Sequence, residues 1–292
     1  MCWLLGVSAS GYYRWLGSSE SRRSRENLEL VEEMRKIHEL MDRSYGSPRM
    51  HEELCARGYC CGRHRVARLM RKHEIIAKMT VRFRRLTKAG KRKPAADNIL
   101  DRKFQVSMPN RVWASDITYI KTAEGHLYLA VVLDLYSRQV VGWGMSSRLN
   151  PDLVIKTLCQ AMAKRDLQPG LLHHSDRDTL YSCDAYQWLL SENGIECSMS
   201  RKGNCYDNAC VESFFSSLKN EYVSFERFRT REEAQLKIFS WIEVFYNRIR
   251  RHSTLGYVSP VDFEIGKAYA SKSVHKIRGT SNPTYENYGN FY

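Results

Sequence analysis

The stretch RVWASDITYIKTAEGHLYLAVVLDLYSRQVVGWGM, residues 111–145, contains three runs rich in Val, Ile, Leu, Tyr and Trp. Turn residues separate them, with Gly125 after the first run and the segment 134–138 after the second. The middle run is almost continuously apolar, which is typical of a strand buried on both faces of a sheet. We therefore expect three strands, of which the second is central: 111–120, 126–136 and 138–145.

After residue 145 the pattern alternates between helices and strands. Asn150 can cap a helix whose first position is Pro151, and the pair 169–170 (Pro-Gly) ends it. This alternation favours an α/β fold in which helices cover a central sheet. The predicted elements are a helix at 150–167, a strand at 171–176, a helix at 184–193, a strand at 195–200 and a helix at 208–222.

The first part of the chain, by contrast, is predicted to be helical throughout. MCWLL and ASGYYRWL, on either side of Gly6, suggest a short helix–turn–helix. The segment 27–43 has apolar residues near the helical period. Two further helices are expected at 50–58 and 62–74.

The helix predicted at 62–74 combines an apolar stripe, Val66, Leu69 and Met70, with a strongly basic face. This is the arrangement of a recognition helix that enters a groove of DNA. An ordinary helical hairpin remains open as the alternative. The residues of the basic face that we expect to contact DNA are Arg63, Arg65, Arg68, Arg71 and Lys72.

Positive charge is concentrated in one segment of the chain. The 292 residues carry a net charge of +14, and residues 57–93 contain fourteen Lys or Arg against one acid, Glu74. A dense block of one sign is what phosphate neutralisation requires, so we expect double-stranded DNA as a partner. We interpret 76–107 as a basic linker that follows a helical region, 1–75. Further expected DNA contacts are Arg84, Arg85 and Lys202.

Other features exclude whole classes of protein. No run of eighteen apolar residues is present, so no membrane-spanning helix is expected, and the first residues lack the pattern of an export signal. The nine cysteines show no disulfide spacing, which predicts a reducing cytoplasm. A zinc site is rejected, because the spacing fits no standard finger: Cys55, Cys60, Cys61 and His64.

Two carboxylates stand where the predicted sheet would form a site. Asp116 lies inside a strand otherwise suited to burial, where an acid is costly unless it binds something positive. Asp176 ends the fourth strand, and sites in such sheets gather at strand ends. If the first and fourth strands pair, the two acids become neighbours. A divalent cation such as Mg²⁺ would then relieve their repulsion.

The helix predicted at 208–222 supplies a third candidate, Glu212, 35 residues after Asp176. Asn208, Glu212 and Lys219 fall on one face of this helix, beside its apolar stripe, so Glu212 should face the sheet. Glu221 falls on the opposite side and is expected to be solvated. Asp207 stands where a loop meets the helix and is interpreted as its cap.

The ordered motifs resemble those of bacterial insertion-sequence transposases of the DDE type, which are related to retroviral integrases. The resemblance extends over roughly 1–265, with LGVSASGYYRW and YGSPRMHEEL near its start. The motifs that carry it are WASDITYI (113–120), LDLYSRQVVGW (133–143), HSDR (174–177), SMSRKGNCYDNACVESFFSSLKNE (198–221) and FYNRIRRHSTLGYVSP (245–260).

The resemblance implies an RNase H-like, integrase-type α/β core with a five-stranded mixed sheet at 108–265, and leaves a tail at 266–292. It implies catalytic and metal-binding roles for Asp116, Asp176 and Glu212, with two Mg²⁺ or Mn²⁺ ions per site. The implied reaction is strand cleavage at element ends followed by transfer of the 3′-hydroxyl to target DNA.

The resemblance also implies partners and further contacts. Lys219 matches a residue that contacts DNA near the scissile phosphate, and Asn208 is expected to contact DNA as well. We expect a homodimer or larger assembly on terminal inverted repeats and target DNA, and fusion or partnership with the product of an upstream reading frame. The implied location is the bacterial cytoplasm, at the nucleoid.

One departure from the family pattern keeps other functions open. After HSDR the family continues Gly-Ser-Gln-Tyr, whereas this chain has Asp178-Thr179-Leu180-Tyr181. The added acid lies two residues from Asp176, so full activity does not follow from the resemblance. The alternatives are a hydrolytic nuclease of the same fold and a DNA-binding repressor with an inactive core.

The remaining polar residues near these motifs receive structural interpretations. Asp134 is expected to form a turn, and His173 and His174 are expected to pack or form hydrogen bonds. The basic helix end at 246–252 suits DNA contact and domain packing equally.

Overall fold

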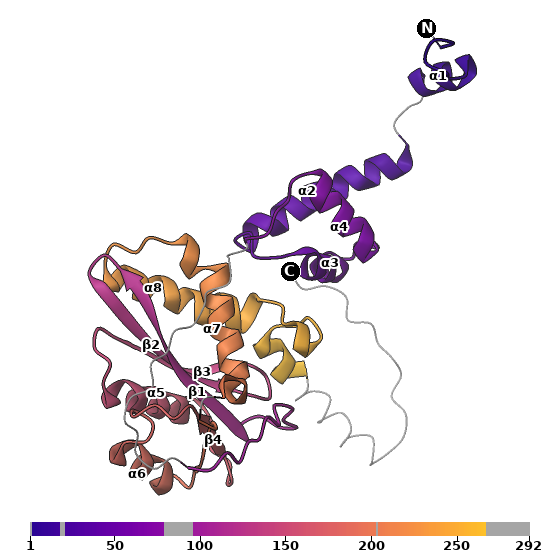
Figure 1. Cartoon of the computed structure of the whole chain (residues 1–292). Coiled ribbons are helices and arrows are strands. Elements are labelled where there is room, and N and C mark those ends of the chain that lie inside the picture. Colours follow the sequence, from indigo (N-terminus) through magenta and orange to yellow (C-terminus); the bar gives the residue numbers. More distant parts are fainter. Residues whose placement is uncertain (1, 18–20, 79–95, 203, 267–292) are drawn as a thin grey trace, which may run out of the picture. The chain divides into compact units, whose positions relative to one another are not determined.

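The computed structural model describes residues 2–17, 21–78, 96–202 and 204–266 (Figure 1). The chain divides into two compact units, residues 1–81 and 82–292, which are described separately below. Arg84, Arg85 and nearly all of the predicted tail lie outside the described residues.

The N-terminal unit is helical, as predicted. Its helices are α1 (Ala9–Leu16), α2 (Arg22–Leu40), α3 (Ser47–Ala56) and α4 (Arg63–Lys72). The prediction of a helix before Gly6 is wrong, because residues 2–6 form a turn. Gly6 adopts a φ of +63°, which ends the turn, and five residues are too few to hold a helix on their own. Ser8 then caps α1 by accepting a hydrogen bond from the Gly11 amide.

A small core holds α2, α3 and α4 together. The apolar stripe predicted for α4 is confirmed, since Val66, Leu69 and Met70 are buried. They join buried residues of the neighbouring helices, which contribute Leu30, Val31, Met34, Ile37, Met50 and Leu54.

The second unit is built on the predicted five-stranded mixed sheet, ordered β3-β2-β1-β4-β5. The antiparallel half contains β3, β2 and β1, and the parallel half contains β1, β4 and β5. The strands are β1 (Val112–Thr122), β2 (Gly125–Asp134), β3 (Val140–Ser146), β4 (Leu172–Ser175) and β5 (Glu196–Met199). β1 is the middle strand, and its residues 113–115 pair with β2 on one side and with β4 on the other.

Helices cover both faces of this sheet, as Figure 1 shows. Residues of α5 (Pro151–Lys164) and α6 (Asp184–Glu192) join one core cluster with the strands. Residues of α7 (Ala209–Glu221), α8 (Arg231–Ser240) and the π-helical segment η3 (Trp241–Ile249) join the other. The sheet therefore lies between two apolar layers, which is the α/β arrangement that the sequence predicted.

Close packing of α5 on β3 depends on a glycine. A Cβ atom at Gly142 would lie 2.6 Å from the Thr157 carbonyl oxygen and 2.8 Å from the Cβ of Ala161. Backbone atoms cannot move aside as a flexible side chain can, so the helix approaches the strand only because position 142 lacks a side chain.

Part of the predicted linker packs on the second unit. Leu100 is buried in the cluster beside α7, and Phe104 and Val106 pack against the same cluster. The amides of Ile99 and Leu100 donate to Ser198 Oγ, at 3.0 and 3.2 Å. In the described residues, no helix is both long enough and apolar enough to cross a membrane.

Candidate active site

The structure places Asp116 and Asp176 one residue beyond the last paired positions of two neighbouring strands. Strands β1 and β4 run parallel with Ser115 opposite Ser175, so each aspartate is the next residue after a paired position. Side chains alternate along a strand, which puts Asp116 on the same face as Ala114, a residue packed with α7. The first and fourth strands therefore pair, which is the condition on which the sequence analysis made the two acids neighbours.

Backbone amides orient both carboxylates. Oδ1 of Asp116 accepts a hydrogen bond of 2.8 Å from the amide of Ile117, and Oδ1 of Asp176 accepts one of 3.0 Å from the amide of Asp178. Both aspartates are half-buried. Each amide donor limits the rotation of the carboxyl group that accepts from it.

Helix α7 carries Glu212 on the side of the sheet where Asp116 lies. The helix packs against β1 through its buried residues Val211, Phe214, Phe215 and Leu218. Glu212, half-buried, stands at the border of this apolar stripe in the first turn.

Asn208 ties the start of α7 to the strand that carries Asp116. Its side chain is 4% exposed, and Nδ2 donates a 3.1 Å hydrogen bond to the carbonyl oxygen of Ser115. Its Oδ1 is buried with no hydrogen-bond partner among the described residues. This position is at odds with the predicted DNA contact, because a buried side chain that joins helix to strand does not face a ligand.

Asp207 is not the helix cap that the sequence suggested. It lies in the 3-10 turn η1 (Cys205–Asn208) and is fully buried. Its carboxylate accepts hydrogen bonds from Asn98, Arg102 and Arg201. The Arg201 hydrogen bonds are the main cause that holds the pKa of Asp207 well below its ordinary range.

Glu221 is not solvated either. Both of its carboxylate oxygens accept hydrogen bonds of 2.6 Å from Arg250, and only 13% of its side chain is exposed. Arg250 follows η3, so the last turn of α7 is joined to a segment 29 residues further along. The basic segment 246–252 therefore contributes at least one residue to packing within this unit.

The histidines beside Asp176 form hydrogen bonds inside the protein, as predicted. His173 Nε2 lies 2.8 Å from Ser115 Oγ and 3.0 Å from the Tyr186 hydroxyl. His174 lies between the hydroxyls of Ser198 and Ser200. Burial lowers the pKa of His173 to about 3 and that of His174 to about 4, so both rings are neutral near pH 7.

Sequence reasoning missed the tyrosines beneath the site. Tyr181 and Tyr186 are fully buried and their rings meet edge to face. Burial raises the pKa of Tyr181 well above its usual value, and the charges of Asp116 and Asp176 add to this effect. The Tyr181 hydroxyl has no hydrogen-bond partner among the described residues. A tyrosine shortly after the HSDR motif was the available signal.

Asp178, the departure from the family pattern, has a local structural role. Its Oδ1 accepts hydrogen bonds from the Leu180 amide (3.0 Å) and the Thr179 hydroxyl (3.4 Å). Its carbonyl accepts from the amides of Tyr181 and Ser182. Asp178 therefore closes the turn after β4. Asp134 is buried, and its Oδ1 accepts from the Tyr136 amide within its own turn, which confirms the predicted turn role. Its Oδ2 accepts from the amide of Asn110, 24 residues earlier in the chain.

The donor chemistry at this edge of the sheet fits a hard divalent cation. Carboxylates are preferred ligands of Mg²⁺, which takes one or two of them and fills its other positions with water and phosphate oxygens. Asp116 and Asp176 match that requirement. Within the described residues, no three or more His, Cys, Asp or Glu side chains lie close enough together to hold a metal ion. The three predicted carboxylates therefore do not lie close enough together in this structure to bind one ion jointly.

Basic and aromatic groups lie further along the same helix. Lys219 Nζ is 5.3 Å from the ring centre of Tyr119, which projects from β1 and is 57% exposed. Lys202, before η1, is exposed. Both predicted DNA contacts therefore reach the surface of the second unit.

In the N-terminal unit, the basic face of α4 is divided. Arg63, Arg68, Arg71 and Lys72 are exposed, as a DNA-contacting face requires. Arg65 is half-buried, and its Nε donates 2.9 Å to Asn27 Oδ1 while Nη2 lies 3.4 Å from Glu26. Arg65 thus joins α4 to α2, which differs from the exposed position we expected.

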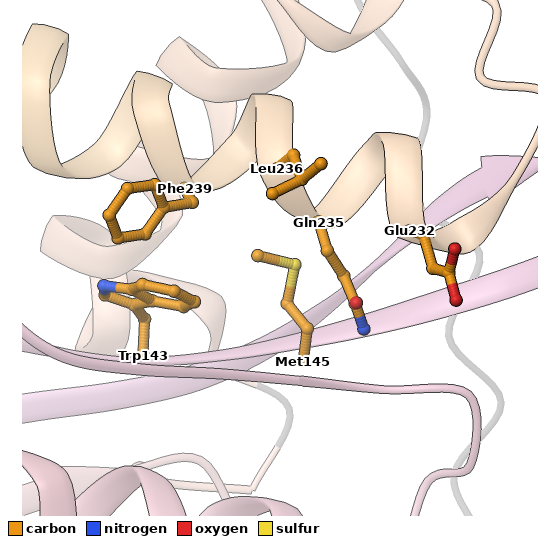
Figure 2. A pocket seen from close by; sticks show the side chains of 6 residues that line it. All are labelled: Trp143, Met145, Glu232, Gln235, Leu236 and Phe239. Carbon is orange, nitrogen blue, oxygen red and sulfur yellow. The ribbon is translucent and has the colours of Figure 1, made fainter.

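A pocket of about 510 Å³ lies apart from the carboxylates. Figure 2 shows Trp143 and Met145 of β3 facing Leu236 and Phe239 of α8 across it. None of the three candidate acids lines this pocket. It is not the candidate active site.

Family models match residues of both units. Two models described as "Integrase core domain" match residues 106–205 and 193–260, and one described as "HTH-like domain" matches 25–83. Similar solved structures include a simian T-cell lymphotropic virus intasome in complex with the PP2A regulatory subunit B56 gamma (14% identity, 88% of this chain, 80% of that chain, TM-score 0.45). They also include the HTLV-2 integrase catalytic core in complex with magnesium (17% identity, 54% and 97% covered, TM-score 0.42).

The curated relatives are closer in sequence. An insertion element IS600 protein of 31 kDa from Shigella sonnei is 42% identical over 263 residues, covering 90% of this chain and 97% of its own. Transposase InsF for insertion sequence IS3A from Escherichia coli strain K12 is 41% identical over 271 residues, covering 90% and 92%. With the integrase core and the HTH-like region both matched, the chain belongs to the family of insertion-sequence transposases that carry an integrase core.

Proposed function

We propose that this chain is a divalent-metal-dependent DNA transposase of the DDE type. It cleaves DNA at the ends of its element and joins the resulting 3′-hydroxyl to target DNA. The observation that supports the proposal is the parallel register of β1 and β4, in which Asp116 and Asp176 each follow the last paired residue, together with the contact of α7, the helix that bears Glu212, with β1. The family supplies the class of reaction, and the site supplies the groups that it needs.

The residues divide the work as follows. Asp116 and Asp176 would hold Mg²⁺ or Mn²⁺ through the carboxylate oxygens that backbone amides already orient. Glu212 would complete the set from α7. When bound, two such ions activate a water or 3′-hydroxyl and stabilise the leaving oxygen of an in-line displacement. Cleavage and joining then differ only in the nucleophile.

Protein groups outside the acids would bind and align the DNA. Lys219 and Lys202 lie on the surface of the second unit, where a cationic side chain can pair with phosphates. The exposed side chains Arg63, Arg68, Arg71 and Lys72 of α4 would engage the terminal repeat. Assembly as a dimer or larger multimer on DNA, and partnership with an upstream reading-frame product, belong to the same proposal.

The test is an in vitro reaction with the element's own terminal repeats, a target duplex and Mg²⁺ or Mn²⁺. Cleaved ends and joined products are expected from the wild type. Neither is expected from Asp116→Asn, Asp176→Asn or Glu212→Gln. Glu196→Gln, which changes an exposed acid on β5, is the matched control and should retain both.

Other outcomes identify the alternatives. Cleavage without joining would favour a hydrolytic nuclease, and DNA binding without either product would favour a repressor. Joined products that persist in Glu212→Gln would refute the assignment of the third carboxylate.

A further inference from the structure

Asp207 is a heavily hydrogen-bonded carboxylate at the start of α7, and the proposed reaction gives it no role. It is 0% exposed. Its oxygens accept hydrogen bonds from Asn98 Nδ2 at 3.0 Å, from Arg102 Nε at 2.9 Å, and from three nitrogen atoms of Arg201 at 2.9–3.0 Å. A buried carboxylate this well satisfied fixes every group that bonds to it.

Asn208, the residue after Asp207, joins the start of α7 to strand β1. Asn208 donates its side-chain hydrogen bond to the carbonyl oxygen of Ser115, directly before Asp116. Glu212 follows Asn208 by four residues, which places the two on one face of the helix, a turn apart. The path from Asp207 through Asn208 therefore sets where the first turn of α7 stands against β1.

On the other side, Asp207 holds a segment that enters the second unit. Asn98 Oδ1 accepts from the Asp101 amide at 3.0 Å while its Nδ2 donates to Asp207. Asp101 and Arg102 adopt φ values of +40° and +59°, an uncommon conformation for residues other than glycine. Such a conformation persists only where surrounding contacts stabilise it, and the hydrogen bonds from Asn98 and Arg102 to Asp207 are among those contacts.

Three separate parts of the chain thus meet at one carboxylate: the segment 98–102, Arg201, which follows β5, and the turn that precedes α7.

A purely structural ion pair exists on the same helix for comparison. Glu221, at the far end of α7, is bonded to Arg250 and lies two turns and more from Glu212.

We propose that Asp207 is a positioning residue for the metal site: by joining Asn98, Arg102 and Arg201 to the start of α7, it fixes the helix turn that carries Glu212 against β1, the strand that carries Asp116. The proposal rests on the proposed function for the role of Glu212. Loss of this junction frees the first turn of α7 and weakens metal binding more than it weakens the fold.

The experiment compares Asp207→Asn with Glu221→Gln in the full chain. Each variant removes a charge from a carboxylate bonded to arginine, one at each end of α7. The first measurement is the concentration of Mn²⁺ or Mg²⁺ at which half of the protein has bound metal, determined by calorimetry in the absence of DNA. We expect Asp207→Asn to raise it by about tenfold, the usual size for loss of a group that orients a metal ligand, and Glu221→Gln to leave it unchanged.

The second measurement is amide hydrogen exchange at residues 209–212, which needs no metal and no activity. Faster exchange in Asp207→Asn than in Glu221→Gln is expected. If Asp207→Asn does not fold, Asn98→Ala and Arg102→Ala serve in its place, since each removes one donor and leaves the carboxylate bonded to Arg201.

The outcomes separate the two proposals. Equal metal affinities and equal exchange in the Asp207 and Glu221 variants would overturn the positioning role. If the wild type binds neither ion, the metal-dependent function fails, and hydrogen exchange alone then decides whether Asp207 fixes α7.

Discussion

Arg250 donates two hydrogen bonds of 2.6 Å to Glu221, one to each carboxylate oxygen, and only 3% of its own side chain is exposed. This pair joins the last turn of α7 to the segment after η3. Glu221→Gln removes the negative charge and one of the two acceptor oxygens, and leaves the Arg250 guanidinium buried without a counter-charge. We therefore expect a loss of about 3 kcal/mol in unfolding free energy. Denaturant unfolding followed by circular dichroism measures it. A loss below about 1 kcal/mol would place the pair among weak surface ion pairs.

Tyr181 and Tyr186 offer a comparison between two buried hydroxyls. The Tyr186 hydroxyl lies 3.0 Å from His173 Nε2, whereas the Tyr181 hydroxyl has no hydrogen-bond partner among the described residues. Tyr186→Phe should therefore destabilise the fold by about 1 kcal/mol, and Tyr181→Phe should leave stability equal or raised. Thermal unfolding of both variants provides the measurement. A larger loss for Tyr181→Phe than for Tyr186→Phe would show that its hydroxyl has a partner in solution, such as water.

Asp134 predicts a dependence of stability on pH. Burial raises its pKa from 3.8 to about 6, against the opposing effect of two backbone amides. The folded state then binds more protons than the unfolded state between pH 4 and 6, so unfolding free energy falls as the pH rises through that window. The contribution is roughly 3 kcal/mol, from about two pKa units.

Asp134→Asn removes this titration and is the variant that isolates it. The difference in unfolding free energy between wild type and variant should change between pH 4 and 6 and stay constant from 7 to 8. Parallel curves over the whole range would contradict the raised pKa.

The divided basic face of α4 predicts two different effects on DNA binding. Arg68 and Lys72 are exposed, so the double substitution Arg68→Ala, Lys72→Ala should weaken binding and reduce the slope of log K against log salt by about 2. Arg65→Ala should instead lower the stability of the N-terminal unit, because it breaks the hydrogen bond to Asn27. Fluorescence anisotropy at several salt concentrations tests the first expectation. An unchanged slope in the double variant would remove α4 from the DNA interface.

The sequence was sufficient for features that depend on local patterns and ordered motifs. The nearly continuous apolar run at 126–136 anticipated β2, an interior strand that lies between β3 and β1, although the middle strand is β1. Periodicity on α4 gave the buried stripe of Val66, Leu69 and Met70. In each case the pattern of apolar and polar residues within the segment is itself the cause of the structure that forms.

The predictions that were wrong concern single polar side chains whose partners lie far away in sequence. A helical wheel places Glu221 opposite the sheet, yet Arg250, 29 positions later, covers it. Asp207 looked like a cap because caps are local, whereas Asn98 and Arg102, more than 100 positions earlier, take its oxygens. No spacing rule reports such partners, since the folded chain alone brings them together.

The junction at Asp207 decides where this protein can be divided. A catalytic fragment that began at residue 108, where the sequence places the start of the core, would lack Asn98 and Arg102 and expose the pocket left by Leu100. Beginning the fragment at residue 96 keeps all three. A fragment that keeps this junction therefore starts at or before Asn98, at least ten residues earlier than the motifs suggest, inside the predicted linker.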